Sequence, residues 1–344
     1  MDFLYFSLNS KFHSKFHSKY KLKNALLVVM LCSMFLTGCG NFSSGGEPLK
    51  ATGFYFDTVI SVTLYEGGTE ELLDQCMELA GYYENLLSAT AEGSDVWKLN
   101  HSMGQTVIVD EDTLIVLNSA LSYARISDGL VDPSIGGLSS LWNFGSGNEE
   151  IIPNEQDIAE ALSHVDYKAI MIDGRQVKVT DPKMQIDLGF IAKGFIGDKM
   201  KEFLSSKGVT SALINLGGNV VTLGNRPGGT PFHIGIQKPF AGAGSAALTL
   251  DISDISVVSS GNYERYFEKD GRLYHHILSS QTGYPTESGL SQVTILSSHS
   301  IDGDALSTLC FILGYEKAAQ LLENYPDIQA IFITEDGEIL YANF

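Results

Sequence analysis

Apolar residues recur at helical spacing in several stretches of the chain. From Glu70 to Leu87 they fall three and four positions apart, which gathers them on one face of an amphipathic helix. Gly208 and Gly314 each follow such a stretch and are typical helix stop residues. Five further helices are expected, over residues 112–127, 155–162, 192–207, 302–313 and 316–324, and Pro153-Asn154 is the start signal of the second of these.

Alternation of apolar and polar residues marks the expected strands. It runs from Phe54 to Tyr65, and Asp173-Gly174 and Asp336-Gly337 are hairpin turns between further strands. Strands and helices do not alternate strictly, so a doubly wound parallel sheet is not indicated. We expect an α+β fold, a largely antiparallel sheet packed with helices in a single domain. Short strands are also expected over 211–216, 220–224, 233–237, 246–252 and 255–259.

The N-terminal segment has the features of an export signal. Five lysines precede Ala25–Leu36, an apolar run of about a dozen residues that is too short for a comfortable permanent membrane span. The run ends in Leu36-Thr37-Gly38-Cys39, which resembles a bacterial lipobox. We therefore expect residues 1–38 to be a lipoprotein signal peptide and Cys39 to carry the lipid. The alternative is an ordinary signal peptide, or a short anchor, with an incidental cysteine.

The export signal predicts the domain organisation and the cellular location of the protein. Ser- and Gly-rich residues after Cys39 predict a flexible tether over 39–50, followed by the folded domain over 51–344. The lipid would hold the protein at the cell membrane, on its extracytoplasmic face.

Composition and charge limit the partners. With 44% hydrophobic and 18% charged residues, the chain suits a globular protein with a sizeable core. Its net charge of −19 argues against nucleic acid as a partner, and an anionic nucleotide would need a metal ion or a local dipole to bind. Cys76 and Cys310 lie in apolar helical patterns, so two buried thiols are favoured over a disulfide.

Two glycine-containing segments are candidates for ligand binding. In Ile186–Asp198, Asp187 and Lys193 flank a strand-to-helix junction, where free N–H groups can face an anion and carbonyls a cation. In Leu213–Asn219, a strand runs into Gly217-Gly218, which permits close approach of a ligand. Either segment, taken alone, is equally explained by a turn that needs glycine.

Two further segments carry titratable or metal-binding groups. The stretch Ser259–Phe267 precedes His275-His276, and on a strand adjacent histidines face opposite sides, so one of them can serve a site as a base. Asp304 and Thr308 are four apart on a predicted helix and offer hard oxygens suited to Mg²⁺ or Ca²⁺. The alternatives are packed or surface histidines, and an acid that complements a helix N-terminus.

Taken together, the order and spacing of these segments resemble the ApbE-type FAD:protein FMN transferases, which are exported and often lipid-anchored. The resemblance covers roughly residues 54–340. It rests on eight segments: Phe56–Ile60, Ser94–Asn100, Gly129–Gly136, Asp187–Asp198, Gly217–Asn219, Ser260–Tyr263, His275–Ile277 and Asp304–Thr308.

The resemblance implies a set of site residues. Asp304 and Thr308 match the family's metal-binding pair, and the backbone carbonyl of Phe190 stands at the third protein ligand. His276 matches a histidine near the reacting phosphate, which makes His276 and Asp304 the expected catalytic residues. The positions that match FAD contacts are Phe56, Leu130, Val131, Asp132, Asp187, Lys193 and Ile277.

The activity that the resemblance implies is transfer of FMN from FAD to a Ser or Thr hydroxyl of an acceptor protein, with release of AMP. One or two Mg²⁺ ions would assist, and His276 would accept the hydroxyl proton. The expected acceptor is an exported or membrane redox subunit with a Ser/Thr motif. Two alternatives remain: a Mg²⁺-dependent FAD pyrophosphatase that uses the same residues, and a non-enzymatic flavin-binding lipoprotein.

Two single positions and one three-residue stretch depart from the family pattern. Phe190 stands where a small residue is usual, although a carbonyl ligand is compatible with it. Thr90 replaces a flavin-contacting tyrosine of many members, and Leu278-Ser279-Ser280 replaces an acidic residue and a proline. These changes bear on flavin affinity and loop shape more than on the chemistry.

Overall fold

The computed structural model describes residues 47–145, 150–242 and 244–344. The expected signal peptide, the lipobox and Cys39 lie outside these residues, as does most of the expected tether. Leu49 and Lys50, which the tether was expected to include, already belong to the first strand. No helix in the described ranges has the length and apolar character needed to cross a membrane.

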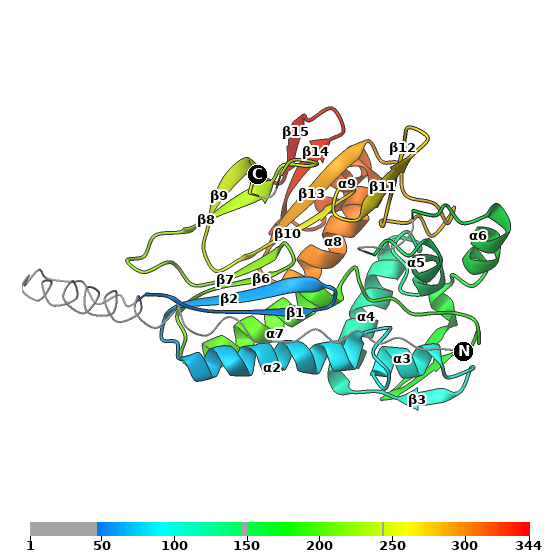
Figure 1. Ribbon diagram of the computed structural model, residues 1–344, viewed down its shortest axis with the longest axis horizontal. Helices are drawn as coiled ribbons and strands as arrows, with labels where there is room; N and C mark the ends of the chain where they lie inside the picture. Colours follow the sequence, from blue (N-terminus) through cyan, green and yellow to red (C-terminus); the bar gives the residue numbers. More distant parts are fainter. Residues whose placement is uncertain (1–46, 146–149, 243) are drawn as a thin grey trace, which may run out of the picture. The chain divides into compact units, whose positions relative to one another are not determined.

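An eight-stranded sheet forms the centre of the fold (Figure 1). Each strand is antiparallel to its neighbours, so the expected α+β class with a largely antiparallel sheet is confirmed. In spatial order the strands are β1 (Leu49–Tyr55), β2 (Thr58–Glu66), β6 (Ser211–Leu216), β7 (Asn219–Leu223), β10 (Ser256–Gly261), β13 (Leu290–Ser297), β14 (Gln329–Thr334) and β15 (Ile339–Ala342).

The single strand expected from Phe54 to Tyr65 is wrong, because a hairpin turn lies inside it. Phe56 and Asp57 connect β1 to β2 with φ of 52° and 55°. A two-residue turn with positive φ at both positions fits the right-handed twist of the flanking strands. Asp tolerates this conformation, but Phe seldom does, so the composition gave no turn signal.

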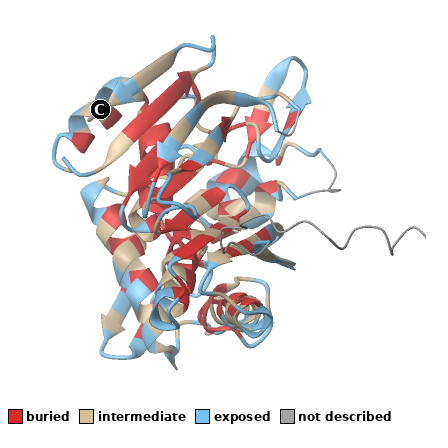
Figure 2. Cartoon of the chain, turned by 90° about the vertical axis from the view of Figure 1, so that its left-hand side faces the viewer, coloured by how far each residue is buried: buried red, intermediate tan, exposed pale blue. Residues whose placement is uncertain are grey.

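Strand β13 was not predicted, although it lies inside the sheet between β10 and β14. All eight of its residues are buried, because helices cover one face of the sheet and a hairpin covers the other. A strand buried on both faces shows no apolar–polar alternation. Figure 2 shows this concentration of buried residues in the strands of the sheet.

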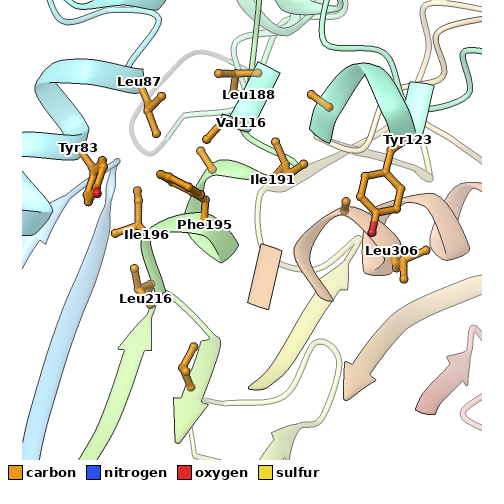
Figure 3. Packing of buried hydrophobic residues seen from close by; sticks show 14 of the residues in the cluster. Tyr83, Leu87, Val116, Tyr123, Leu188, Ile191, Phe195, Ile196, Leu216 and Leu306 are labelled. Atoms are coloured by element: carbon orange, nitrogen blue, oxygen red, sulfur yellow. The ribbon is translucent and has the colours of Figure 1, made fainter. Parts of the chain in front are cut away.

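The predicted helices are present with boundaries shifted by at most two residues. Five of them pack one apolar cluster against the sheet, in which Phe195 and Ile196 approach Tyr83 and Leu216 (Figure 3). Cys76 and Cys310 are buried in this cluster and free, as expected. The helix over residues 155–162 instead buries Ile158 in a separate cluster. The helices are α2 (Glu70–Leu87), α4 (Glu111–Ile126), α6 (Glu155–Leu162), α7 (Ala192–Ser206), α8 (Ser300–Leu313) and α9 (Tyr315–Leu322).

Smaller elements surround the sheet. The hairpin of β8 (Phe232–Gln237) and β9 (Ala246–Ile252) packs Phe232 and Ile236 against Val257 and Leu296 of the sheet. The remaining elements are α3 (Asp95–Asn100), α5 (Gly136–Trp142), a 3-10 turn (Tyr167–Ala169), the small sheet of β3 (Thr106–Ile108), β5 (Gln176–Val179) and β4 (Ile170–Asp173), and the hairpin of β11 (Tyr266–Lys269) and β12 (Arg272–His275).

Candidate active site

The site is organised by a close contact between α7 and α8. A Cβ atom at Gly194 would lie 2.2 Å from the carbonyl oxygen of Ser300 and 2.7 Å from the Cβ of Asp304, so only glycine fits there. Gly194 is in the first turn of α7, where backbone N–H groups have no partner within the helix. Its N–H donates to Oδ2 of Asp304 at 2.8 Å, which fixes this buried carboxylate at the N-terminus of α7.

Asp198 of α7 holds the other helix. Its carboxylate accepts hydrogen bonds from the backbone N–H groups of Ser300 at 2.7 Å and Ile301 at 2.9 Å, which caps α8. The helix therefore begins two residues before the predicted start, and Asp304 lies in its second turn. Asp198, rather than Asp304, complements the N-terminus of α8.

Lys193 and Thr308 complete a polar cluster around Asp304. Nζ of Lys193 lies 3.9 Å from Oδ1 of Asp304 and donates to the carbonyl oxygen of Gly189 at 3.2 Å. Oγ1 of Thr308 lies 3.1 Å from Oγ of Ser260. Carboxylate and hydroxyl oxygens with a lysine beside them form a surface suited to a phosphate and a hard cation.

A cavity of about 170 Å³ opens onto this cluster. All the predicted FAD, metal and catalytic residues line it except Phe56, which lines an adjoining cleft of about 530 Å³. The predicted residues that the cavity brings together are Leu130, Val131, Asp132, Asp187, Phe190, Lys193, His276, Ile277, Asp304 and Thr308.

Two of the aspartates use their carboxylates to shape the loops at the cavity. Oδ1 of Asp132 accepts from the backbone N–H and the hydroxyl of Ser134 at 2.8 and 2.6 Å, and Oδ2 accepts from the N–H of Tyr167 at 3.0 Å. Burial raises the pKa of Asp132, and these hydrogen bonds oppose that rise. Oδ1 of Asp187 accepts from the N–H of Gly189 at 2.8 Å. Loop shape is therefore a structural role for both residues.

The adjacent histidines have different environments. His275, at the end of β12, packs inward: Nε2 donates to the carbonyl of Thr286 at 3.0 Å and Nδ1 accepts from the N–H of Ile277 at 3.3 Å, in the tautomer that this network requires. His276 lines the cavity, and its buried Nδ1 has no hydrogen-bond partner. Burial, reinforced by Arg265, lowers the pKa of His276 well below its usual value, so the imidazole is neutral.

Glu264 and Arg265 were quoted in a candidate segment but were assigned no role. Both line the cavity and the adjoining cleft. Desolvation of its carboxylate raises the pKa of Glu264 to about 7, and the positive charges of Lys193 and Arg265 oppose this rise. The position of Glu264 and Arg265 shortly after the end of β10 was the available signal, but a charged pair after a strand is too common to identify a site.

The positions that depart from the family pattern differ in their distance from the site. Leu278 lines the cavity, and the hydroxyl of Ser280 donates to the carbonyl of Gly129 at 2.5 Å, which joins two cavity loops. Thr90 lines neither the cavity nor the adjoining cleft, and its hydroxyl lies 3.1 Å from Oγ of Ser88.

The donor set fits a hard divalent cation. Asp304 and Thr308 supply oxygens on one helix face, and Phe190 lines the same cavity. No group of three His, Cys, Asp or Glu side chains able to hold a metal occurs among the residues that the structure covers.

Known proteins share both the sequence and this architecture. The ApbE family pattern matches residues 56–332. A Treponema pallidum (strain Nichols) protein named FAD:protein FMN transferase is 34% identical over 91% of each chain. A Klebsiella pneumoniae (strain 342) protein of the same name is 38% identical over 80% of this chain and 85% of its own.

Solved structures of ApbE proteins have a similar fold. The ApbE protein of Thermotoga maritima has a TM-score of 0.79 and 30% identity, and the match covers 86% of this chain and 97% of that one. The apo form of the Pseudomonas stutzeri flavinyl transferase ApbE has a TM-score of 0.75 and 28% identity, with 88% and 95% covered. The chain belongs to the ApbE family.

Proposed function

We propose that the protein transfers FMN from FAD to a Ser or Thr hydroxyl of an acceptor protein and releases AMP, with the help of Mg²⁺. The relatives that share most of its length are named for FMN transfer from FAD to protein. The observation that carries the proposal is the cluster of Asp304, Lys193 and Thr308 at one cavity wall. It offers a cation site beside a positive side chain in an otherwise acidic protein.

The residues around the phosphates neutralise charge. Mg²⁺ held by Asp304, Thr308 and the carbonyl of Phe190 would neutralise the pyrophosphate and the charge on departing AMP. Lys193 and Arg265 line the same cavity and place positive charge where the phosphates would lie. Since α7 begins beside this cavity, its N-terminal N–H groups favour the anion as well.

The transfer itself is a substitution at the phosphorus of the FMN half of FAD. The acceptor oxygen forms a bond to this phosphorus, the bond from phosphorus to the AMP oxygen breaks, and AMP leaves with the electron pair. His276 is our candidate for the group that takes the hydroxyl proton, because it lines the cavity as a neutral imidazole, the form that can accept a proton.

Mass spectrometry of an acceptor protein incubated with FAD, with and without Mg²⁺, tests the proposal. Covalent FMN on a Ser or Thr side chain, formed only with Mg²⁺, is the expected result. AMP formed at the same rate without an acceptor, and no flavin on the acceptor, would instead identify the protein as an FAD pyrophosphatase. Tight binding of FAD without any AMP would identify a flavin-binding protein.

We also propose that Cys39 carries a lipid and holds the domain at the extracytoplasmic face of the cell membrane. The support is the lysine-rich start, the apolar run Ala25–Leu36 and the lipobox that ends at Cys39. In the native host, Cys39→Ser should abolish lipid labelling and release the protein from the membrane fraction. A labelled Cys39→Ser protein would refute the assignment.

A further inference from the structure

Strand β8 has one paired edge and one free edge. In the part of the chain that the structure describes, its sheet partner is β9 alone, with Phe232 opposite Ile252 and Ile236 opposite Leu248. In an antiparallel pair, every second residue points its N–H and C=O away from the partner. These outward groups of β8 form a row that another extended chain can bind.

The adjoining cleft of about 530 Å³ runs along this free edge. Four consecutive residues of β8, from Ile234 to Gln237, line it, and β9 contributes none. Successive side chains of a strand point to opposite faces, so a cavity that touches four residues in a row follows the strand's edge rather than a face. The lining also includes the Gly217-Gly218 turn, where a Cβ atom at Gly218 would meet nothing within 4 Å.

This cleft is continuous with the site cavity. Four residues line both spaces: Lys193, Ser259, Glu264 and Arg265. Lys193 is also the residue that lies 3.9 Å from Asp304. A chain that follows β8 therefore reaches the place where the FAD phosphates are proposed to bind.

A second opening, of about 560 Å³, meets the site cavity at Leu130 and Ile312. Its other lining comes from loop residues of 279–287, from Arg272, and from Leu313 and Lys317 at α8 and α9. Among these lining residues, Arg272 alone comes from a strand. This opening has side chains but lacks a row of free strand groups, so it serves as the control surface.

We propose that the acceptor protein binds as an extended segment along the free edge of β8 and delivers its Ser or Thr hydroxyl through this cleft. The inference rests on the proposed transfer activity, which requires a second substrate that reaches the FAD phosphates. Backbone hydrogen bonds to β8 provide the affinity, as in other strand-addition complexes. Phe56, which matches an FAD-contacting position of the family, lines the same cleft, so we expect the dinucleotide and the acceptor segment to meet there.

Photo-crosslinking locates the acceptor. The probe is a seven-residue peptide with one central Thr, selected from a random library as the best FMN acceptor of the wild-type enzyme with FAD and Mg²⁺. A benzophenone amino acid replaces Gly235 on β8 in one variant and Gln281 at the second opening in the matched control. We expect at least tenfold more crosslinked peptide from position 235. A larger yield from position 281 would overturn the proposal.

N-methylation of the peptide backbone tests the same point on the unmodified enzyme, should the Gly235 variant fold poorly. Methyl groups on alternate residues should lower FMN transfer at least tenfold, while those between them have little effect, because only every second N–H faces β8. Equal effects at all positions would refute strand addition while transfer itself remained intact. A wild-type enzyme that modifies no peptide or protein would refute the transfer activity, and the docking proposal with it.

Discussion

The two faces of the central sheet are built differently, and the difference matches the two substrates. On one face α7 and α8 meet so closely that Gly194 cannot carry a Cβ atom, and Asp304 is buried and held there by a backbone N–H group. On the other face lies the β8–β9 hairpin, with an open cleft along its free edge. A phosphate-activating site needs rigid groups, whereas a protein segment needs an accessible surface.

The largest expected effect is on the rigid face. Asp304→Asn keeps an oxygen for the Gly194 N–H but removes the charge that would hold Mg²⁺. We expect Mg²⁺-dependent FMN transfer to fall about 1,000-fold, or about 4 kcal/mol of transition-state free energy. Initial rates at varied Mg²⁺ measure it. Asp302→Asn, on the same helix but outside the cavity, is the control, and equal activity of the two variants would contradict the metal assignment.

Gly194→Ala should reveal how tightly the two helices are packed. The added methyl group would lie 2.2 Å from the Ser300 carbonyl, so the helices must separate, and we expect a loss of about 3 kcal/mol in the free energy of unfolding. Chemical denaturation measures the loss. Gly137→Ala, on helix α5, meets nothing within 4 Å and should cost no stability. Similar curves for both variants would show that the helix contact is looser than described.

The buried His275 makes the fold sensitive to acid. Burial lowers its pKa from 6.5 to about 4, so the unfolded chain binds more protons between these values. Stability is therefore full above about pH 6.5 and falls as the pH drops toward 4, by about 3 kcal/mol if the whole shift is expressed. Urea denaturation at pH 7 and 4.5 measures this slope. His275→Gln should reduce this slope and leave the part that the neighbouring His276 contributes, because burial lowers the pKa of His276 as well. An unchanged slope would show that His275 is not a source of the acid sensitivity.

His276 is expected to act on the rate rather than the fold. We expect His276→Ala to lower FMN transfer about 100-fold while leaving the dissociation constant of FAD nearly unchanged, because a base acts in the transition state. Single-turnover rates and FAD fluorescence separate the two quantities. An unchanged rate would mean that another cavity residue, with Glu264 the first to examine, takes the proton.

The smallest effect should be on the open face. At Gly235 of β8 a new methyl group would lie 3.3 Å from the Cβ of Ala246, a contact that a small shift relieves. Gly235→Ala should change the free energy of unfolding by no more than about 0.5 kcal/mol, against about 3 kcal/mol for the same change at Gly194. A large loss at Gly235 would remove the contrast between the two faces.

Prediction from sequence succeeded where one pattern had one structural meaning. The amphipathic period of residues 70–87 located α2, since one apolar face of a helix must be buried, and the start signal Pro153-Asn154 located α6. Prediction failed at β13, because a strand that is buried on both faces shows no alternation of apolar and polar residues. It also failed at Phe56-Asp57, where a bulky residue adopts a turn conformation. The local sequence of a strand does not show which other elements cover each of its faces.

Some residues of the site could likewise be predicted from the sequence, and others could not. Asp304 and Thr308 could be paired from their spacing because a helix places residues four apart on one face. Glu264, Arg265 and the capping role of Asp198 depend on contacts between segments about 40 to 100 residues apart.

By itself the sequence determined the class of fold, most helices, the ApbE family and the residues that gather at the cavity. The tertiary structure alone decided that Gly194 binds the Asp304 carboxylate, that His275 faces the core while His276 faces the cavity, and that β8 keeps a free edge beside the site. The physical reason is that short-range periodicity records which side of an element is buried. Which partner buries it, and which edge stays open, depends on how distant segments pack.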